Sequence, residues 1–406
     1  MLRFSTAGSV DDGKSTLIGR LLHDTRQVLE DQLAALARAS ARRGLDAPDL
    51  SLLTDGLEAE REQGITIDVA YRYFATPRRK FIVADTPGHE QYTRNMATGA
   101  STADVAVVLA DVRKGLLPQS RRHLYIAHLL GIRHVVVAVN KMDLAGYSRE
   151  AFEAVRAAFE TFAAPLAIPD LRFVPVSALH GDLVVERGTR MDWYPGPALL
   201  ELLETLEPAQ NELALPLRFP VQLVQRRAEA RAYLGRVASG AVRVGDEVVA
   251  LPSARRAAVS GIRTLEGERG AALAGDSVAL LLAGEIDIAR GDLIAEAGRA
   301  PRPARSLAAK LVWLGEDPAA PDGSYLLKHA TRTVPARIAA VDYRVDVETL
   351  GRHAPGPRIA MNDIVRVGLQ AQQPVFCDPY LANRGTGAFI LIDPLTNGTV
   401  AAGMIE

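Results

Sequence analysis

The sequence predicts an α/β domain with a mostly parallel sheet, followed by two small β-barrels. Its 406 residues exceed one ordinary domain, and a chain of this length usually forms two or three. Up to about residue 210, apolar runs of strand length alternate with helical patterns, as in doubly wound folds. After Pro208 the helical periodicity fades, and short β-rich runs separated by Gly and Pro follow, which is typical of small barrels.

Five apolar runs in the first part are the expected strands of the parallel sheet. Several are apolar at every position, as strands covered on both faces tend to be. The five runs are Leu2–Ala7, Lys80–Ala84, Val105–Ala110, Val135–Val139 and Phe173–Val176.

The segment Gln27–Arg43 places Leu29, Leu33 and Leu36 at helical spacing, with charged residues on the other side. This pattern predicts an amphipathic helix. We expect it to pack on its own domain, and a helix that faces a partner is the alternative.

Two groups of β-rich runs predict the two barrels. The first group is Phe219–Val224, Ala232–Ala238, Glu247–Pro252 and Ser277–Leu282, and the second is Ala308–Leu314, Thr333–Asp342, Ile364–Leu369 and Ala388–Asp393. Between them, the Pro-rich stretch Ala300–Arg305 predicts a linker. The predicted domains are therefore 1–210, 214–300 and 305–406.

Composition indicates the cellular compartment of the protein and the classes of partner to expect. The net charge is −1, so no bulk electrostatic argument favours DNA or an anionic membrane. The single cysteine, Cys377, excludes an internal disulfide framework and fits a reducing cytosol. Met1–Phe4 leads straight into the first motif, leaving no room for a secretory signal, and the apolar runs are far shorter than the roughly 20 residues of a membrane span. We expect a cytoplasmic protein.

The first motif is a phosphate loop. Gly8–Ser15, GSVDDGKS, fits G-x-x-x-x-G-K-[ST] between a strand and a helix, the context in which this motif binds phosphate. Its glycines let backbone N–H groups surround the β-phosphate, Lys14 reaches the β and γ oxygens, and Ser15 supplies a hydroxyl to Mg²⁺. The helix that begins near Lys14 adds the positive end of its dipole. A chance glycine-rich turn is the alternative.

The second motif, DTPGH at Asp85–His89, follows the apolar run Phe81–Ala84. An aspartate at this place holds Mg²⁺, usually through water, and the Gly88 amide can meet the γ-phosphate. His89 is placed to orient the attacking water. A structural histidine is the alternative.

The third motif, NKMD at Asn140–Asp143, ends the run Val135–Val139 and explains the choice of base. The Asp143 carboxylate can accept hydrogen bonds from N1–H and N2–H₂ of guanine. Adenine lacks this donor pair, so ATP would leave a buried charge unpaired. Lys141 can lay its aliphatic stem along the purine face.

Two weaker motifs complete the set. Thr66, in GITID, lies where a switch loop would bring a hydroxyl to Mg²⁺ and the γ-phosphate. Ser177, Ala178 and Leu179 follow the last predicted strand, and their backbone amides can contact guanine O6.

The five motifs in this order, followed by two barrels, resemble the translation elongation-factor branch of the GTPases over nearly the whole chain. Factors that carry aminoacyl-tRNA usually show histidines where Ser9 and Asp12 stand. Four longer segments are similar instead to the GTPase (large) subunit family of bacterial ATP sulfurylases, also called sulfate adenylyltransferase subunit 1. These segments are SVDDGKSTLIGRLLHDT, DGLEAEREQGITIDVAYRYF, DTPGHEQYTRNMATGAS and GDLVVERGTRMDWYPGPALLELLE.

This resemblance implies an α/β P-loop GTPase domain followed by two barrels of the elongation-factor type. It implies GTP and Mg²⁺ as ligands, and a hetero-oligomer with a separate small subunit, sulfate adenylyltransferase subunit 2. That subunit makes adenosine 5′-phosphosulfate and pyrophosphate from ATP and sulfate, and the large subunit couples GTP hydrolysis to this uphill step. No DNA, RNA or membrane partner is expected. The rivals are a translation factor that binds aminoacyl-tRNA or the ribosome, and an interaction module whose GTP hydrolysis is only a timer.

The resemblance also implies roles for single residues. The catalytic set is Lys14, Thr66 and His89, and the Mg²⁺ ligands are Ser15, Thr66 and Asp85. The nucleotide-binding set comprises Gly8, Ser9, Val10, Asp11, Asp12, Gly13, Lys14, Ser15, Thr16, Asp85, Thr86, Pro87, Gly88, His89, Asn140, Lys141, Met142, Asp143, Ser177, Ala178 and Leu179.

Overall fold

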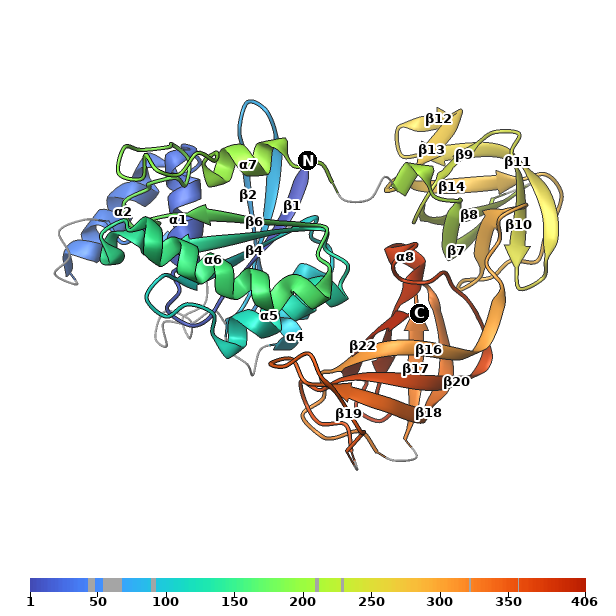
Figure 1. Cartoon of the computed structure of the whole chain (residues 1–406). Coiled ribbons are helices and arrows are strands. Elements are labelled where there is room, and N and C mark those ends of the chain that lie inside the picture. The colour runs from blue at the N-terminus through green and yellow to red at the C-terminus, as the bar shows by residue number, and fades with distance from the viewer. Residues whose placement is uncertain are drawn as a thin grey trace. The chain divides into compact units, whose positions relative to one another are not determined.

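Two compact units make up the protein, 1–209 and 210–406, and Figure 1 shows the computed structural model of the chain. The structure describes residues 1–42, 48–53, 68–88, 93–208, 212–227, 230–320, 323–356 and 358–406.

The first unit is built on a six-stranded sheet with the strand order β2-β3-β1-β4-β5-β6. All neighbouring strands pair in parallel except β2 and β3, and β4 is buried along its whole length, as its uniformly apolar sequence predicts. The strands are β1 (Leu2–Ala7), β2 (Ala70–Ala75), β3 (Lys80–Asp85), β4 (Val105–Asp111), β5 (His134–Asn140) and β6 (Asp170–Pro175).

Helices accompany the strands of this sheet (Figure 1). They are α1 (Lys14–Asp24), α2 (Glu30–Arg42), α4 (Thr93–Ala100), α5 (Pro118–Leu129), α6 (Arg149–Ala163) and α7 (Leu199–Thr205), with short 3₁₀ turns at η1 (Leu50–Leu53), η3 (Met142–Ala145) and η4 (Ala164–Leu166). The helix expected within Gln27–Arg43 is α2. It buries Leu36, whereas Leu29 precedes it and is 64% exposed, so only part of the predicted apolar stripe packs on the unit. None of the helices in the described ranges has the length and apolar character needed to cross a membrane.

Strand order brings the predicted motifs to one edge of the sheet. The last residues of β1 and β3 lie side by side, with Thr6 opposite Asp85, and the last residues of β4 and β5 do the same, with Asp111 opposite Asn140. Because the carboxyl ends of parallel strands meet at one edge, the loops after them gather there, which is where ligands usually bind in open α/β sheets.

Two β-barrels form the second unit, which confirms the predicted fold class. Pairing of β10 with β11 closes the first barrel, and pairing of β17 with β18 closes the second. The sheet of the first barrel consists of β7 (Arg218–Arg227), β8 (Ala230–Arg236), β10 (Glu247–Leu251), β11 (Arg255–Thr264), β12 (Gly267–Arg269), β14 (Ser277–Leu282) and β15 (Leu293–Glu296), after the 3₁₀ turn η5 (Glu212–Ala214). The short strands β9 (Ala241–Arg243) and β13 (Ala271–Leu273) pair with each other in a separate two-stranded sheet. The second consists of β16 (Pro303–Trp313), β17 (Ser324–His329), β18 (Arg332–Val345), β19 (Arg352–His353), β20 (Ile364–Phe376), β21 (Ala388–Ile392) and β22 (Thr399–Ile405), with the short helix α8 (Arg384–Gly387).

Each barrel has its own core, and a small apolar cluster joins them. Phe376 of β20 packs in one cluster with Leu251 and Leu293 of the first barrel. Beside it, the largely buried Arg218 pairs with Asp378 at 2.9 Å. The linker predicted at Ala300–Arg305 is shorter than expected, because β16 already begins at Pro303, a strand-start position where the missing N–H of proline is tolerated.

Candidate nucleotide site

The phosphate loop connects β1 with α1 and requires glycine at Gly13. That residue has φ 93° and caps the N-terminus of α1, a left-handed conformation that favours glycine. A Cβ there would lie 2.4 Å from Asn140 Nδ2. Since α1 begins at Lys14, the unpaired amide groups of its first turn are available at the loop, an arrangement suited to phosphate.

The Lys14 side chain lies inside this loop. Its Nζ donates to the carbonyl oxygens of Gly8 at 2.9 Å and Ser9 at 3.1 Å. Burial lowers the pKa of Lys14, while the nearby Asp85 and Asp12 carboxylates act in the opposite direction. The ammonium group is therefore held where phosphate oxygens can replace the loop carbonyls as its partners.

Asp12 stabilises the phosphate loop through a hydrogen bond within it. Its fully buried side chain accepts the Ser9 amide N–H on Oδ2 at 2.7 Å. Burial raises the pKa of Asp12 to about 6, although the Ser9 N–H and the Lys14 charge favour its ionised form. The side chain of Asp12 thus acts on the shape of the loop.

The segment after β3 lies against the phosphate loop. Asp85 accepts the hydroxyl of Thr6 at 3.3 Å, and the Thr86 hydroxyl donates to the Thr6 carbonyl at 2.6 Å. At Gly88 a Cβ would lie 2.3 Å from the Gly8 carbonyl oxygen and 2.4 Å from Lys14 Nζ. Only a residue without a side chain allows this approach.

Two of the predicted catalytic residues, Thr66 and His89, lie outside the described residues, and their roles stay predictions. The other predicted magnesium ligands, Ser15 and Asp85, offer a hydroxyl and a carboxylate, the hard oxygen donors that Mg²⁺ prefers. These residues therefore fit the ion by the chemistry of their donor atoms. In the described ranges, no group of three or more His, Cys, Asp and Glu residues is arranged to hold a metal by itself.

Asn140, the first residue of the NKMD motif, joins this motif to two other loops. Its Nδ2 donates to the Asp12 carbonyl oxygen at 2.8 Å, and its Oδ1 accepts the Ala178 amide N–H at 3.0 Å. The loops after β1, β5 and β6 therefore share one side chain.

The Asp143 carboxylate is held by its neighbour across this edge. The Ser177 hydroxyl donates to Asp143 Oδ1 at 2.7 Å. Met142 is fully buried beneath this turn, while Leu179 is 60% exposed. This edge of the sheet thus combines a carboxylate oxygen held by Ser177 with an exposed apolar side chain on the next loop.

Asp111, the last residue of β4, was missed by the sequence analysis. It is fully buried, accepts Arg113 in bidentate fashion at 3.0 and 2.7 Å, and lies 3.1 Å from Lys141 Nζ. Burial alone would raise the pKa of Asp111, but the hydrogen bonds from Arg113 and Lys141 hold it well below its usual range. Its ionised carboxylate fixes Lys141, which also donates to the Asp11 carbonyl oxygen. The sequence offered only a charged residue directly after the apolar run Val105–Ala110, which by itself does not indicate the partners of that residue.

His123 of α5 was also missed. Burial, together with the positive charges of Lys14 and Arg122, lowers its pKa to about 3. It is therefore a neutral group near the phosphate lysine at physiological pH, and nothing in its local sequence distinguishes it from a surface histidine.

Two protein-family models match parts of this chain. The model of the elongation factor Tu GTP binding domain matches residues 1–210, and that of the GTP-eEF1A C-terminal domain-like family matches residues 306–406. Guanine-nucleotide binding belongs to the first of these domains.

Similar proteins extend over the full length of the chain. Sulfate adenylyltransferase subunit 1 of Alteromonas mediterranea is 51% identical over 408 residues, covering 100% of this chain and 86% of that protein. Its counterpart in Saccharophagus degradans is 52% identical with the same coverage. The bifunctional enzyme CysN/CysC of Mycobacterium tuberculosis is 53% identical over 411 residues, covering 100% of this chain and 67% of that protein. The chain therefore belongs to the sulfate adenylyltransferase subunit 1 family, within the elongation factor Tu type of GTP-binding proteins.

Proposed function

We propose that this protein is the GTP-hydrolysing subunit of a sulfate adenylyltransferase. It couples hydrolysis of GTP to the formation of adenosine 5′-phosphosulfate and pyrophosphate from ATP and sulfate, which a separate small subunit carries out. The observation that carries the proposal is identity of about half of all residues, over the whole chain, to proteins of that name.

The nucleotide chemistry is assigned to four loops at one edge of the sheet. Lys14 and the amide groups at the start of α1 neutralise the β- and γ-phosphates. Asp143 accepts the N–H groups of guanine, and the stem of Lys141 covers one face of the base. The exposed side chain of Leu179 is suited to cover the other face, because it gains apolar contact only when a ligand is present.

Mg²⁺ would be held by Ser15 and Asp85, with Thr66 as the third protein ligand. When bound, the ion neutralises charge on the phosphate oxygens. What the chain itself contributes is placement: Gly88 has no side chain at a point where a Cβ would lie 2.3 Å from the Gly8 carbonyl oxygen and 2.4 Å from Lys14 Nζ, so the backbone there can lie close to the phosphate loop. His89, which directly follows Gly88 in the sequence, orients the attacking water.

The adenylation step runs uphill, because the phosphosulfate anhydride is higher in energy than the bond broken in ATP. GTP binding orders the loop that contains Thr66 and the segment after Asp85, and hydrolysis releases both. We assign the coupling to this change, transmitted to the small subunit.

The second candidate function is that of a translation factor. Its support is the elongation factor Tu domain match itself. The residue at position 12 argues against a translation factor, because factors that carry aminoacyl-tRNA usually have histidine there. In this chain the Asp12 carboxylate accepts the Ser9 amide N–H and so is part of the structure of the loop.

The test is reconstitution with the candidate small subunit. We expect the two chains to co-purify, GTP turnover to rise with ATP and sulfate present, and GTP consumption to keep step with adenosine 5′-phosphosulfate formation. A rate of GTP turnover that stays the same with and without the small subunit, ATP and sulfate would overturn the proposal. GTP consumed without a fixed ratio to product would indicate a timer, and GTP-dependent binding of aminoacyl-tRNA would favour the translation factor.

A further inference from the structure

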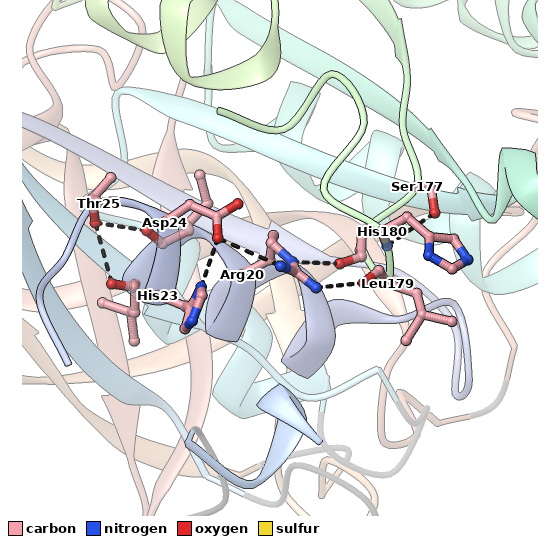
Figure 2. Close-up of polar contacts among 10 residues, drawn as sticks. Arg20, His23, Asp24, Thr25, Ser177, Leu179 and His180 are labelled. Atoms are coloured by element: carbon pink, nitrogen blue, oxygen red, sulfur yellow. Dashed lines mark hydrogen bonds and ion pairs between the residues drawn. The ribbon is translucent and has the colours of Figure 1, made fainter. Parts of the chain in front are cut away.

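Arg20 of α1 holds the loop after β6 through two consecutive carbonyl groups. Its Nε donates to the Ala178 carbonyl oxygen at 3.1 Å, and its Nη2 donates to that of Leu179. Figure 2 shows the guanidinium reaching from the helix to this loop. The Arg20 side chain is only 19% exposed, so its charge-assisted hydrogen bond to Ala178 is partly shielded from water and correspondingly strong, while the one to Leu179 lies at the surface.

The position of Arg20 is itself fixed. Asp24, one turn further along α1, places Oδ1 3.5 Å from Arg20 Nη1, and His23 Nδ1 lies 2.7 Å from the same oxygen (Figure 2). Gly181 has φ 85° and donates its amide N–H to the Ser177 carbonyl at 2.7 Å. A Cβ at Gly181 would lie 3.4 Å from Asp24 Oδ2 and 3.5 Å from Arg20 Cδ. The loop therefore closes directly over the ion pair.

The peptide group between Leu179 and His180 connects Arg20 to Asp143, the residue expected to bind the base. Because a trans peptide is planar, its C=O and N–H point in opposite directions. With the Leu179 carbonyl fixed on Arg20, the His180 N–H is directed away and donates to Ser177 Oγ at 3.3 Å (Figure 2). The Ser177 hydroxyl donates in turn to Asp143 Oδ1 at 2.7 Å. A continuous chain of hydrogen bonds and one peptide group thus joins Arg20 to the guanine-reading carboxylate.

We propose that Arg20 is a positioning residue for recognition of the guanine base. It fixes the loop whose amides approach guanine O6 and, through Ser177, the orientation of Asp143. Arg20 follows Lys14 by six residues on the same helix, a rise of about 9 Å, so one rigid element sets the spacing between the phosphate and base ends of the site. The inference rests on the proposed function, since it requires guanine as the base.

The test compares GTP with ITP, which lacks the 2-amino group that Asp143 would bind. In Arg20→Ala, we expect the Kd for GTP to rise about tenfold, the loss of one hydrogen bond to a charged group. The Kd for ITP should rise less, so the preference for GTP over ITP shrinks. Turnover at saturating GTP should stay within about twofold, because the interaction lost is with the base and not with the transferred phosphate.

Arg156→Ala is the matched control. Arg156 of α6 forms a comparable i,i+4 ion pair with Glu160 at 2.9 Å and lies over the ring of Phe173. Its removal should leave both dissociation constants unchanged. Arg20→Lys keeps the charge and can reach one carbonyl group, so it should fall between the wild type and Arg20→Ala. It also carries the test if the alanine variant is unfolded at the assay temperature.

Combination with Ser177→Ala tests the relay itself. If Arg20 acts through Ser177, the double variant should lose less GTP-over-ITP preference than the two single losses together. Fully additive losses, an unchanged preference in Arg20→Ala, or an equal loss of both nucleotides with a lowered Tm would overturn the inference. A wild-type protein that does not prefer GTP to ATP would refute the proposed function instead.

Discussion

The side-chain amide of Asn140 donates to the Asp12 carbonyl oxygen at 2.8 Å, and its own carbonyl oxygen accepts the Ala178 amide at 3.0 Å. Asn140 is 2% exposed, so both bonds are shielded from water. The loop after β1 and the loops after β5 and β6 are therefore not independent, because one buried side chain is hydrogen-bonded to both neighbours.

Asn140→Ala should destabilise the first unit and weaken GTP binding together. The change leaves one backbone acceptor and one donor without their partner, and each unsatisfied buried group costs about 1–3 kcal/mol. We expect the free energy of unfolding to fall by that order and the Kd for GTP to rise at least about tenfold. Urea denaturation and nucleotide titration measure the two effects.

Asn383→Ala is the control for this prediction. Asn383 is likewise buried and donates to Ser239 Oγ at 2.9 Å, in the second unit. It should cost stability without changing the affinity for GTP. If Asn140→Ala binds GTP as the wild type does, the coupling between the loops is absent.

The central strands β4 and β5 were predictable because burial on both faces leaves an almost uninterrupted apolar run. The edge strand β2 was not, since its residues AYRYFA mix apolar and polar positions, and Tyr73 is 69% exposed. A strand covered on one side only carries a weaker pattern. Its antiparallel pairing with β3 depends on the chain reversal between them, which no periodicity encodes.

The motif residues were predicted from spacing along the chain, whereas the residues that contact and hold them were not. Asp111 contacts Lys141 only because β4 and β5 are neighbours in register. Arg20 meets Ala178 across 158 residues of sequence. Such contacts follow from strand order and loop closure, so a single sequence without its fold does not contain a local signal for them.

His89→Ala should lower GTP turnover with little effect on GTP affinity. The histidine follows Gly88 in the motif, and its expected role is to orient water, a contribution typically worth about a hundredfold or more in rate. Single-turnover hydrolysis and nucleotide titration separate the two quantities. His353→Ala, an exposed histidine of the second unit, is the control and should leave both unchanged. Losses of equal size in turnover and affinity would argue against the role of His89.

Gly88→Ala should impair nucleotide binding although it adds only a methyl group. The new Cβ would lie 2.3 Å from the Gly8 carbonyl and 2.4 Å from Lys14 Nζ, so the lysine or the loop must move. We expect the Kd for GTP to rise about tenfold or more, since the charge-assisted bonds of Lys14 depend on its place. Gly270→Ala is the control, because its Cβ would meet nothing within 4 Å. Equal GTP affinity in both variants would show that the loop accommodates the methyl group without loss of binding, which would contradict the prediction.

Arg218→Ala should strongly destabilise the second unit. Its guanidinium makes two hydrogen bonds of 2.9 Å to Asp378, and the Arg218 side chain is 3% exposed. Removing it leaves the Asp378 carboxylate without its counter-charge, which typically costs about 3–5 kcal/mol. In contrast, Arg256→Ala removes an exposed pair with Glu247 at 3.3 Å and should cost at most about 1 kcal/mol. Similar unfolding midpoints for the two variants would contradict this ranking.

The pH dependence of stability should carry a contribution from Asp12. Burial raises its pKa from 3.8 to about 6 in the folded protein. Between these values the folded state keeps a proton that the unfolded chain releases, so the stability contributed by Asp12 falls as pH rises from about 4 to about 6 and then levels off. Asp12→Asn keeps an acceptor for the Ser9 amide but cannot ionise. Relative to the wild type without nucleotide, its free energy of unfolding should therefore increase by about 3 kcal/mol across this window.

Asp111→Asn separates this effect from a general loss of a buried carboxylate. Arg113 and Lys141 hold the pKa of Asp111 below its usual range, so both folded and unfolded states are largely ionised at this position above about pH 5. The difference between Asp111→Asn and the wild type should be unfavourable and nearly constant from there to pH 6 and beyond. Urea denaturation at several pH values measures both differences. A flat difference for Asp12→Asn as well would mean that the Asp12 carboxyl ionises in the folded loop as easily as in the unfolded chain.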